Sequence, residues 1–401
     1  MQRRIAITGI GAVTPLGTGV EPLFERWCAG ERGFEDGFGR CSSFDPAEHL
    51  SKREVRRSDR FTQLAVTAAH EALDGAGWTA GLPVEADRIG CVVGTGFGGM
   101  QTVEEQARHV QNGGGRRVSP LGISLAMPNA APGMIALRYG LKGLAHGVVA
   151  ACAAGADAIG TAARLICAGD AEAMVAGGSD ACLTAIGITF TEKAGMMSKL
   201  GAMRPFDVRR DGLLLGEGAG MLVLEDYELA EGRGAPILAE LLGYGASADA
   251  FHLAAPHPEG DGAARAIRLA LRDAGLEPGD VDYVNAHGTS TPLNDRAETL
   301  ALKAALGEDA YRVPVSSTKS VIGHLCGAAG AAEAAVTVLA LQRRTAPPTV
   351  GYEEPDEELD LNYVPGEPQP IGTSARGDGR AVALSNSFGF GGHNAVLCIA
   401  A

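Results

Sequence analysis

The stretch VVAACAAGADAI, residues 148–159, predicts a strand that turns sharply into a helix. A cysteine at this junction, Cys152, lies at a helix N-terminus, where unsatisfied N–H groups and the helix dipole favour a thiolate. The small residues on either side of Cys152 would let the backbone approach a substrate closely. The stretch therefore indicates a nucleophile elbow. A buried, inert cysteine is the alternative for an Ala/Gly-rich segment, and residues further along the chain bear on the choice.

The composition places limits on the class of protein. A chain of 401 residues can form two domains or one large fused core. Its net charge of -14 argues against binding to nucleic acid or to an anionic membrane surface. The eight cysteines contain no C-x-x-C pair, so we expect reduced thiols in a cytosolic protein and no metal site. No apolar run is expected to be long enough to cross a bilayer.

Apolar strands alternate with amphipathic helices, which is typical of parallel sheets covered by helices on both faces. Strands are expected at 4–10, 88–93, 148–149, 172–178, 221–224, 237–243, 281–286, 313–316, 381–384 and 395–399. Helices are expected at 20–29, 61–76, 102–111, 129–139, 155–163, 263–274, 295–306 and 327–341, with loops at 31–50 and 200–220. The same order of elements restarts at residue 237, so we expect two similar α/β halves that meet near residues 229–235.

Three polar stretches interrupt the apolar pattern of the second half. The first, 285–295, carries His287 at the carboxyl end of a strand, where open α/β sheets bind ligands. The second, 316–330, carries Lys319 and then His324 just before a helix of small residues. The third, 386–394, is a glycine run whose N–H groups can face an oxyanion. Together with a thiol, these stretches supply what acyl transfer requires, although each alone has a plain structural explanation.

These motifs jointly resemble those of an elongating β-ketoacyl-acyl-carrier-protein synthase, the ketosynthase of a dissociated fatty-acid or type II polyketide system. The resemblance covers essentially the whole chain. It rests on the Cys152 elbow, His-Gly-Thr-Ser-Thr-Pro at 287–292, Lys319 through His324, Gly-Phe-Gly-Gly-His-Asn at 389–394, Arg-Pro-Phe-Asp at 204–207 and the glycine-rich run at 211–220.

The resemblance implies the thiolase fold, with two similar βαβαβ halves in a five-layer α/β/α/β/α core. The N-terminal half, residues 1–230, would carry the nucleophile, and the C-terminal half, residues 231–401, would carry both histidines. Such enzymes are usually dimers. Whether this chain pairs with itself or with a chain-length-factor-like subunit stays open.

The resemblance also implies roles for individual residues. Cys152 would accept the acyl chain from acyl carrier protein as a thioester. His287 and His324 would hold the malonyl thioester and promote its decarboxylation, and the enolate would then attack the acyl group. The N–H groups of Cys152 and Phe390 would form the oxyanion hole. Lys319, also assigned to the catalytic group, would orient the His324 loop together with Glu333 rather than act as a base.

Further residues are assigned to binding. Thr289 and Thr291 would bind the pantetheine arm, and Phe390 would also gate the acyl pocket, whose far end Val103 would line. Asn394 is given a supporting role. The basic run with Arg53, Arg56 and Arg57 would be the docking site for acidic acyl carrier protein, against the alternative of a solvated helix start. No cofactor is expected, because the phosphopantetheine of the carrier holds the substrates.

The pathway stays open at this point. Leu144 stands where the family usually has proline, and Ala153 and Ala154 follow the nucleophile where a hydroxyl residue is common. These departures make specialised polyketide or polyene synthesis an alternative to primary fatty-acid synthesis. Two other functions were weighed. A chain-length-factor subunit lacks the nucleophile, and the paired histidines with the lysine argue against a thiolase acting on CoA esters.

Overall fold

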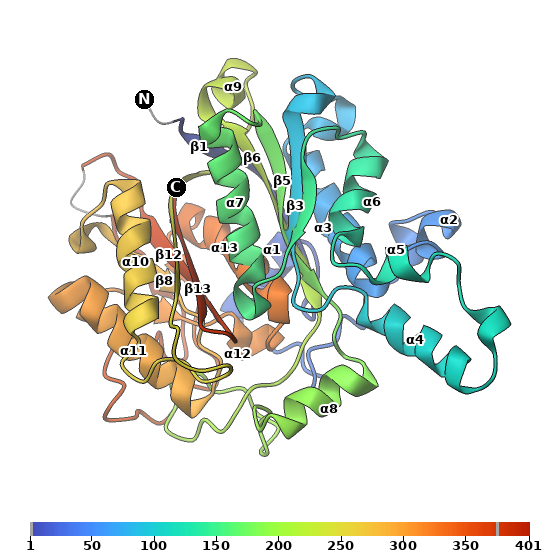
Figure 1. Cartoon of the computed structure of the whole chain (residues 1–401). Coiled ribbons are helices and arrows are strands. Elements are labelled where there is room, and N and C mark those ends of the chain that lie inside the picture. Colours follow the sequence, from blue (N-terminus) through green and yellow to red (C-terminus); the bar gives the residue numbers. More distant parts are fainter. Residues whose placement is uncertain (1–2, 374–376) are drawn as a thin grey trace.

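One 11-stranded sheet runs through the protein, and its two five-stranded halves have the same strand order and join where β1 pairs with β7 (Figure 1). The structure is a computed structural model that describes residues 3–373 and 377–401. The strands are β1 Ile5–Thr14, β2 Gly17–Thr18, β3 Ile89–Gly94, β4 Ala145–Val148, β5 Ala173–Asp180, β6 Gly218–Asp226, β7 Ala239–Ala248, β8 Tyr283–Asn285, β9 Val315–Ser316, β10 Thr345–Ala346, β11 Gln369–Pro370, β12 Val382–Gly389 and β13 His393–Ala400.

The helices lie on both faces of this sheet and between its halves. They are α1 Val20–Cys28, α2 Lys52–Val55, α3 Arg60–Gly75, α4 Met100–Gln111, α5 Gly122–Ala126, α6 Ala130–Tyr139, α7 Ala154–Ala168, α8 Ala185–Lys193, α9 Tyr227–Gly232, α10 Asp261–Ala274, α11 Pro292–Leu306, α12 Lys319–Ile322 and α13 Ala329–Gln342. Two short 3-10 helices matter for the site, η5 Ala151–Ala153 and η8 Cys326–Ala328. The sequence pattern did not indicate α5, α8, α9 or α12.

The two halves share their topology as well as their composition. The first half runs β4-β3-β5-β6-β1, and the second runs β9-β8-β12-β13-β7 in the matching order. In each half the first three strands are parallel and the last two are antiparallel to their neighbours. The expectation of purely parallel sheets is therefore wrong. Strands buried on both faces are continuously apolar in either direction, so the local pattern does not encode strand direction.

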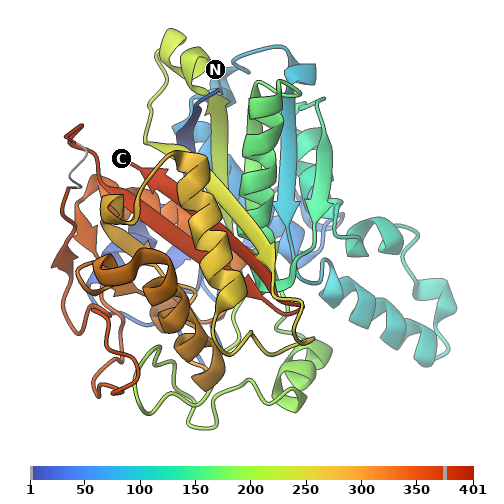
Figure 2. The ribbon, with the colours of Figure 1, turned by 60° about the vertical axis from the view of Figure 1, so that its left-hand side comes forward.

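Antiparallel pairing of β1 with β7, at Ile5–Leu241 to Ile7–Ala239, joins the two sheets. Helices α3 and α6 cover the outer face of the first sheet, and α10 and α11 cover that of the second (Figures 1 and 2). Helices α7 and α13 pack between the sheets and contact both. The result is the five-layer α/β/α/β/α arrangement that the resemblance implied.

Small residues in the central layer allow the helices to pack closely. A Cβ atom on Gly155 of α7 would lie 2.8 Å from the carbonyl oxygen of Gly327 and 2.9 Å from the backbone nitrogen of Ala331. A Cβ on Gly94 of β3 would meet the carbonyl oxygen of Ala154 at 2.1 Å. Gly155 thus has a packing role within the central layer. Contact between α7, α13 and β3 requires a small residue at this position.

The stretch Ala151–Ala168, which includes α7, is long and apolar enough to cross a membrane by length and composition alone. This finding corrects the expectation that no run of the chain is long enough. More than half of the stretch, 56%, is buried inside the protein, where α7 packs against β3 and β5. A core helix between two sheets passes the same test of length and composition.

Candidate active site

Cys152 lies in the turn between β4 and α7, as the sequence predicted. The residue before it, Ala151, has φ 48°, a conformation that costs energy for a residue with a Cβ. The turn contacts the end of β12, since a Cβ on Gly389 would lie 3.0 Å from the backbone nitrogen of Cys152 and 2.9 Å from the carbonyl oxygen of Ala150. The end of β12, which belongs to the second half of the chain, therefore packs against the strained turn at Ala151.

The electrostatics of Cys152 differ from the sequence-based expectation. Burial raises the pKa of the Cys152 thiol to about 12, while the charge of Lys319 and a hydrogen bond from the Phe390 N–H act in the opposite direction. Burial therefore opposes the thiolate that a helix N-terminus would favour at Cys152. The hydrogen bond also places the Phe390 N–H beside the cysteine sulfur.

His287 lies two residues after the end of β8 and is positioned through its backbone. The N–H groups of His287 and Gly288 donate to the two carboxyl oxygens of Glu298 on α11, at 2.8 Å each. The amide of Asn386 on β12 donates to the same carboxyl at 3.0 Å. Burial raises the pKa of Glu298 to about 7. The Nδ1 atom of His287 is buried and has no hydrogen-bond partner among the described residues, so the ring has an unused polar atom within the site.

His324 is held by the loop that precedes β6. Its N–H donates to the carbonyl of Leu214 at 2.8 Å, and its carbonyl accepts from the N–H of Gly216 at 2.9 Å. Its ring nitrogen Nδ1 accepts a hydrogen bond from the N–H of Cys326 at 3.0 Å. Since Nδ1 is an acceptor, the neutral ring carries its proton on Nε2. This ring therefore presents a donor to a bound oxygen atom.

The two imidazole rings pack edge to face. Their ring centroids are 5.5 Å apart, with planes at 83°. Burial, followed by the positive charge of Lys319, lowers the pKa of His324 to about 3 and lowers that of His287 well below its usual value. Both rings are therefore neutral at physiological pH. Because Lys319 also acts on the pKa of Cys152, the cysteine and the two histidines share one cluster.

Lys319, the first residue of α12, forms an ion pair with Glu333 of α13, and Nζ lies 2.6 Å from Oε1. Both side chains are completely buried. Burial raises the pKa of Glu333 against the opposing effect of Lys319. The ammonium group of Lys319 is therefore ion-paired with the Glu333 carboxylate inside the protein.

The structure also locates the residues assigned to substrate binding. The hydroxyls of Thr289 and Thr291 are 2.8 Å apart, beside His287 and at the start of α11. Phe390 follows β12 and is 38% exposed, so its ring can move without a cavity opening in the core. The Asn394 amide donates to Asp249 at 2.7 Å and to the carbonyl of Gly392 at 3.1 Å, which fixes the turn between β12 and β13.

The outer residues lie away from this cluster. Val103 is on α4 and is 52% exposed, so in a single chain it forms no enclosed pocket wall. Arg53, Arg56 and Arg57 are exposed on or directly after α2. The Arg56 guanidinium donates to the carbonyl of Lys52 at 3.1 Å, whereas the side chains of Arg53 and Arg57 make no hydrogen bond or ion pair with the residues that the structure describes. The charges of Arg53 and Arg57 are therefore available to a partner.

Two carboxylates of the site were not anticipated from the sequence. Glu298 positions His287, as described above. Asp180, the last residue of β5, accepts hydrogen bonds from the N–H of Gly96 at 2.7 Å, the N–H of Gly327 at 2.6 Å and the hydroxyl of Thr95 at 2.7 Å. The only sequence signal for Asp180 is its position at the carboxyl end of an apolar strand.

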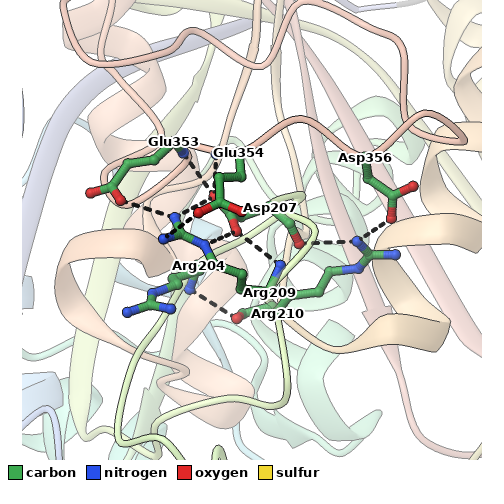
Figure 3. Close-up of polar contacts among 8 residues, drawn as sticks. Arg204, Asp207, Arg209, Arg210, Glu353, Glu354 and Asp356 are labelled. Carbon is green, nitrogen blue, oxygen red and sulfur yellow. Dashed lines mark hydrogen bonds and ion pairs between the residues drawn. The ribbon is translucent and has the colours of Figure 1, made fainter.

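The Arg-Pro-Phe-Asp motif and the two arginines that follow it form hydrogen bonds and ion pairs with residues 353–356 (Figure 3). The Asp207 carboxylate accepts hydrogen bonds from the Arg209 side chain and from the N–H groups of Glu353 and Glu354, each at 2.8–2.9 Å. These bonds hold the pKa of Asp207 below its usual value despite burial. The Arg204 N–H donates to the hydroxyl of Ser290, next to Thr289 and Thr291, at 2.8 Å. The motif therefore anchors the segment that carries the threonines.

The two matching halves and the cysteine–histidine–histidine cluster between them define a thiolase-fold enzyme of the acyltransferase class. Models of the β-ketoacyl synthase N-terminal and C-terminal domains match residues 38–230 and 238–353. The chain belongs to the β-ketoacyl synthase family.

Individual relatives agree over the full length of the chain. A 3-oxoacyl-[acyl-carrier-protein] synthase 2 from Synechocystis sp. is 43% identical, covering 99% of this chain and 97% of its own. One matched chain comes from a solved complex, described as a type II PKS acyl-carrier protein in complex with its ketosynthase bound to the hexaketide. It has a TM-score of 0.89 and 31% identity, with 100% of both chains covered. The ishigamide ketosynthase/chain length factor gives a TM-score of 0.89 and 34% identity, covering 100% of this chain and 99% of its own.

Proposed function

We propose that this enzyme condenses an acyl chain held on Cys152 with malonyl-acyl carrier protein to give β-ketoacyl-acyl carrier protein and carbon dioxide. The observation that carries the proposal is the clustering of Cys152 with two neutral imidazoles, whose centroids are 5.5 Å apart, and with the N–H of Phe390 beside the sulfur. Family membership and the full-length relatives support the same reaction.

In the first step, the sulfur of Cys152 attacks the thioester carbonyl of the acyl carrier protein. The Cys152–acyl bond forms, the bond to the pantetheine sulfur breaks, and the proton of the Cys152 thiol is transferred to the departing thiol. The N–H groups of Cys152 and Phe390 stabilise the oxyanion of the tetrahedral intermediate. Because the resting group is a thiol, loss of this proton is part of the barrier to acylation.

In the second step, His287 and His324 donate hydrogen bonds to the thioester carbonyl oxygen of malonyl-acyl carrier protein. The bond between the carboxylate and the methylene carbon breaks and carbon dioxide leaves. The electron pair of the broken bond stays with the methylene carbon and forms the enolate. The enolate carbon then attacks the Cys152-bound carbonyl, and the cysteine sulfur departs and takes up a proton. Neutral imidazoles suit this role, because a donor stabilises the developing negative charge without transferring its own proton.

We assign supporting roles to the neighbouring groups. Lys319 and Glu333 position the His324 loop and adjust its electrostatics. Thr289 and Thr291, whose hydroxyls lie beside His287, bind the pantetheine arm, and Phe390 gates the acyl pocket. Residues 1–230 supply the nucleophile, and residues 231–401 supply both histidines. No resident cofactor takes part, because the carrier brings each substrate on phosphopantetheine, and we place the reaction in the cytoplasm.

Acyl carrier protein docks on Arg53, Arg56 and Arg57. Their exposure, and the absence of internal partners for the Arg53 and Arg57 guanidinium groups among the described residues, support this assignment in a chain of net charge -14. The solved complex of a ketosynthase with a type II PKS acyl-carrier protein supports the same class of partner. Electrostatic complementarity with an acidic carrier would mainly raise the rate of association.

A second subunit covers the surface formed by α4, α5, α6 and the edge strand β4. These elements lie together at one side of the molecule, from which α4 and α5 project (Figure 1). Their exposed apolar residues include Val103, Val110, Ile123, Leu137, Leu144 and Val149. An apolar surface beside an unpaired edge strand is typical of an interface. The partner is a second copy of this chain or a chain-length-factor-like subunit, and in either case Val103 would be enclosed.

Two observations weigh against other functions. A chain-length-factor subunit alone would lack the nucleophile that this chain has at Cys152. A degradative thiolase acting on CoA esters would not need the paired histidines with Lys319. The reaction fits two pathways, primary fatty-acid synthesis and specialised polyketide or polyene synthesis. The similarity to a type II PKS ketosynthase complex and to the ishigamide ketosynthase/chain length factor supports the second.

Mass spectrometry of the purified chain mixed with a fatty acyl carrier protein tests the proposal. We expect a thioester on Cys152 and, after malonyl-acyl carrier protein is added, release of β-ketoacyl-acyl carrier protein. Cys152→Ala should form no adduct, and Cys28→Ala should behave as the unsubstituted chain. An adduct only after addition of a chain-length-factor subunit would identify an obligate heterodimer. Acylation at another cysteine, or full condensation by Cys152→Ala, would overturn the mechanism.

A further inference from the structure

A second pair of cysteines lies beside the active site and takes no part in the proposed reaction. The Sγ atoms of Cys182 and Cys326 are 3.1 Å apart, with the Cys182 thiol donating a hydrogen bond. Cys182 lies between β5 and α8 and is 1% exposed, whereas Cys326 begins η8 and is partly exposed. The two residues are separated by 144 positions, so the fold, not the local sequence, brings them together.

The pair is directly connected to a proposed catalytic group. The N–H of Cys326 donates to Nδ1 of His324 at 3.0 Å, and this bond fixes the ring's tautomer and orientation. Cys326 has φ 52°, so its backbone is already in a sparsely populated conformation. Any shift of Cys326 therefore acts on His324.

The segments that carry the two thiols are held together next to the pair. Asp180, two residues before Cys182, accepts the N–H of Gly327, the residue after Cys326, at 2.6 Å. This bond holds the two segments next to each other and so keeps the two sulfurs close. A disulfide has an S–S distance near 2.05 Å, so the sulfurs need to approach by only about 1 Å to bond.

We propose that Cys182 and Cys326 form a redox-sensitive dithiol, which a peroxide converts to a disulfide that turns off condensation by displacing the N–H that orients His324. The predicted loss of condensation rests on the proposed function of His324, whereas formation of the Cys182–Cys326 disulfide does not. Oxidation proceeds in two balanced steps. The Cys326 sulfur attacks the peroxide, giving a sulfenic acid and water or an alcohol. The Cys182 sulfur then attacks the sulfenic sulfur, the S–S bond forms, and water leaves.

The burial of the two residues sets the order of attack. Cys326 is accessible and meets the oxidant, while the enclosed Cys182 resolves the sulfenic acid before further oxidation. The hydrogen-bonded contact with the Cys182 thiol, followed by burial, raises the pKa of Cys326 well above its ordinary value, so we expect oxidation to be slow and to accelerate with pH. Cys152 also lies near Cys326. It could therefore compete with Cys182 for the oxidised Cys326 sulfur.

The consequence for catalysis differs between the two steps. Acylation of Cys152 uses the N–H groups of Cys152 and Phe390, which the disulfide does not touch. Decarboxylation uses His324, whose Nδ1 would lose or misalign its donor. Loss of one such orienting hydrogen bond corresponds to a roughly tenfold slower condensation step. The oxidised enzyme is therefore expected to hold an acyl chain that it does not extend.

The test uses the full-length chain treated with hydrogen peroxide, quenched by thiol alkylation and digested for mass spectrometry. We expect a peptide crosslinked between Cys182 and Cys326, a roughly tenfold loss of malonyl-dependent condensation, and retained acylation of Cys152. A thiol reductant should restore condensation. Cys182→Ala should keep basal condensation and lose the reversible inhibition, whereas Cys28→Ala, which removes a partly exposed cysteine elsewhere, should remain sensitive.

Three results would overturn the inference. The first is the absence of the Cys182–Cys326 peptide under conditions that oxidise Cys28. The second is reversible inhibition explained entirely by a disulfide that includes Cys152. The third is a crosslinked enzyme that condenses at the original rate. Failure of the proposed function is distinguishable, because the reduced chain would then show no acylation of Cys152 before any peroxide is added, while the crosslink is read from peptides alone.

Discussion

The Nζ atom of Lys319 lies 2.6 Å from Oε1 of Glu333, and the two side chains are completely buried between α12 and α13. The second carboxyl oxygen, Oε2, is buried without a hydrogen-bond partner among the described residues. One of the two carboxyl oxygens of Glu333 therefore has its hydrogen-bond partner inside the protein and the other has none among the described residues. Removing a single member of such a buried ion pair destabilises the fold more than replacing both members.

Lys319→Met leaves the Glu333 carboxylate buried without its partner. Breaking a buried ion pair on one side costs about 3–5 kcal/mol, whereas replacing both members by apolar residues is often neutral. We therefore expect Lys319→Met to lower the unfolding midpoint in urea strongly, and the double variant Lys319→Met/Glu333→Leu to recover most of the loss. Arg265→Met is the control, because the Arg265–Asp261 pair is exposed and should be worth less than about 1 kcal/mol. Equal losses for Lys319→Met and Arg265→Met would show that the buried pair is not coupled.

His324 should contribute a recognisable pH dependence to stability. Its pKa is about 3 in the folded protein and about 6.5 when unfolded, so between these values the unfolded chain binds more protons. Its contribution is therefore fully present above pH about 6.5 and is lost as pH falls towards 3. His324→Asn removes the titration and is the reference. We expect the free energy of unfolding, measured in urea, to fall more steeply with acidification in the unsubstituted chain. Parallel curves for the two proteins would contradict a depressed pKa.

Gly389→Ala tests the contact between the β12 end and the nucleophile turn. The added Cβ would lie 2.9 Å from the Ala150 carbonyl oxygen and 3.0 Å from the Cys152 nitrogen, both of which are backbone atoms that cannot rotate away. Displacement of a reacting group by about 1 Å can cost up to about 100-fold in rate. We expect acylation of Cys152, followed by mass spectrometry over time, to slow at least severalfold. Gly75→Ala, at a helix end with no atom within 4 Å of its Cβ, should leave the rate unchanged. An equal effect of both substitutions would remove the support for this contact.

The sequence predicted what local pattern and chemistry can specify. Cys152 and His287 lie shortly after the strands β4 and β8, whereas His324 follows the short helix α12. The helix expected at 61–76, observed at Arg60–Gly75, has clear amphipathic periodicity. The direction of β6 and β13 was not predictable from the same pattern, because a strand buried on both faces is apolar whichever way it runs.

The partners of the site residues were less predictable than the residues themselves. Glu298 binds the backbone of His287 across 11 positions, and Asp180 binds Gly327 across 147. The desolvation that raises the pKa of Cys152 comes from the packing of several distant segments. Local sequence indicates a helix N-terminus at Cys152, but it does not report how completely water is excluded from the sulfur.

The basic surface on and after α2 should control association with acyl carrier protein and not the chemical steps. The double variant Arg53→Glu/Arg57→Glu reverses two exposed charges that lack internal partners among the described residues. We expect the KM for an acyl carrier protein to rise roughly tenfold at low ionic strength, with a smaller effect at high salt because exposed charges are screened. The rate with a carrier-free pantetheine thioester should not change. Arg272→Glu, on α10 at the other side of the molecule, is the control (Figure 1). An equal effect of Arg272→Glu, or a change with the carrier-free thioester, would assign the loss to net charge or to folding instead of docking.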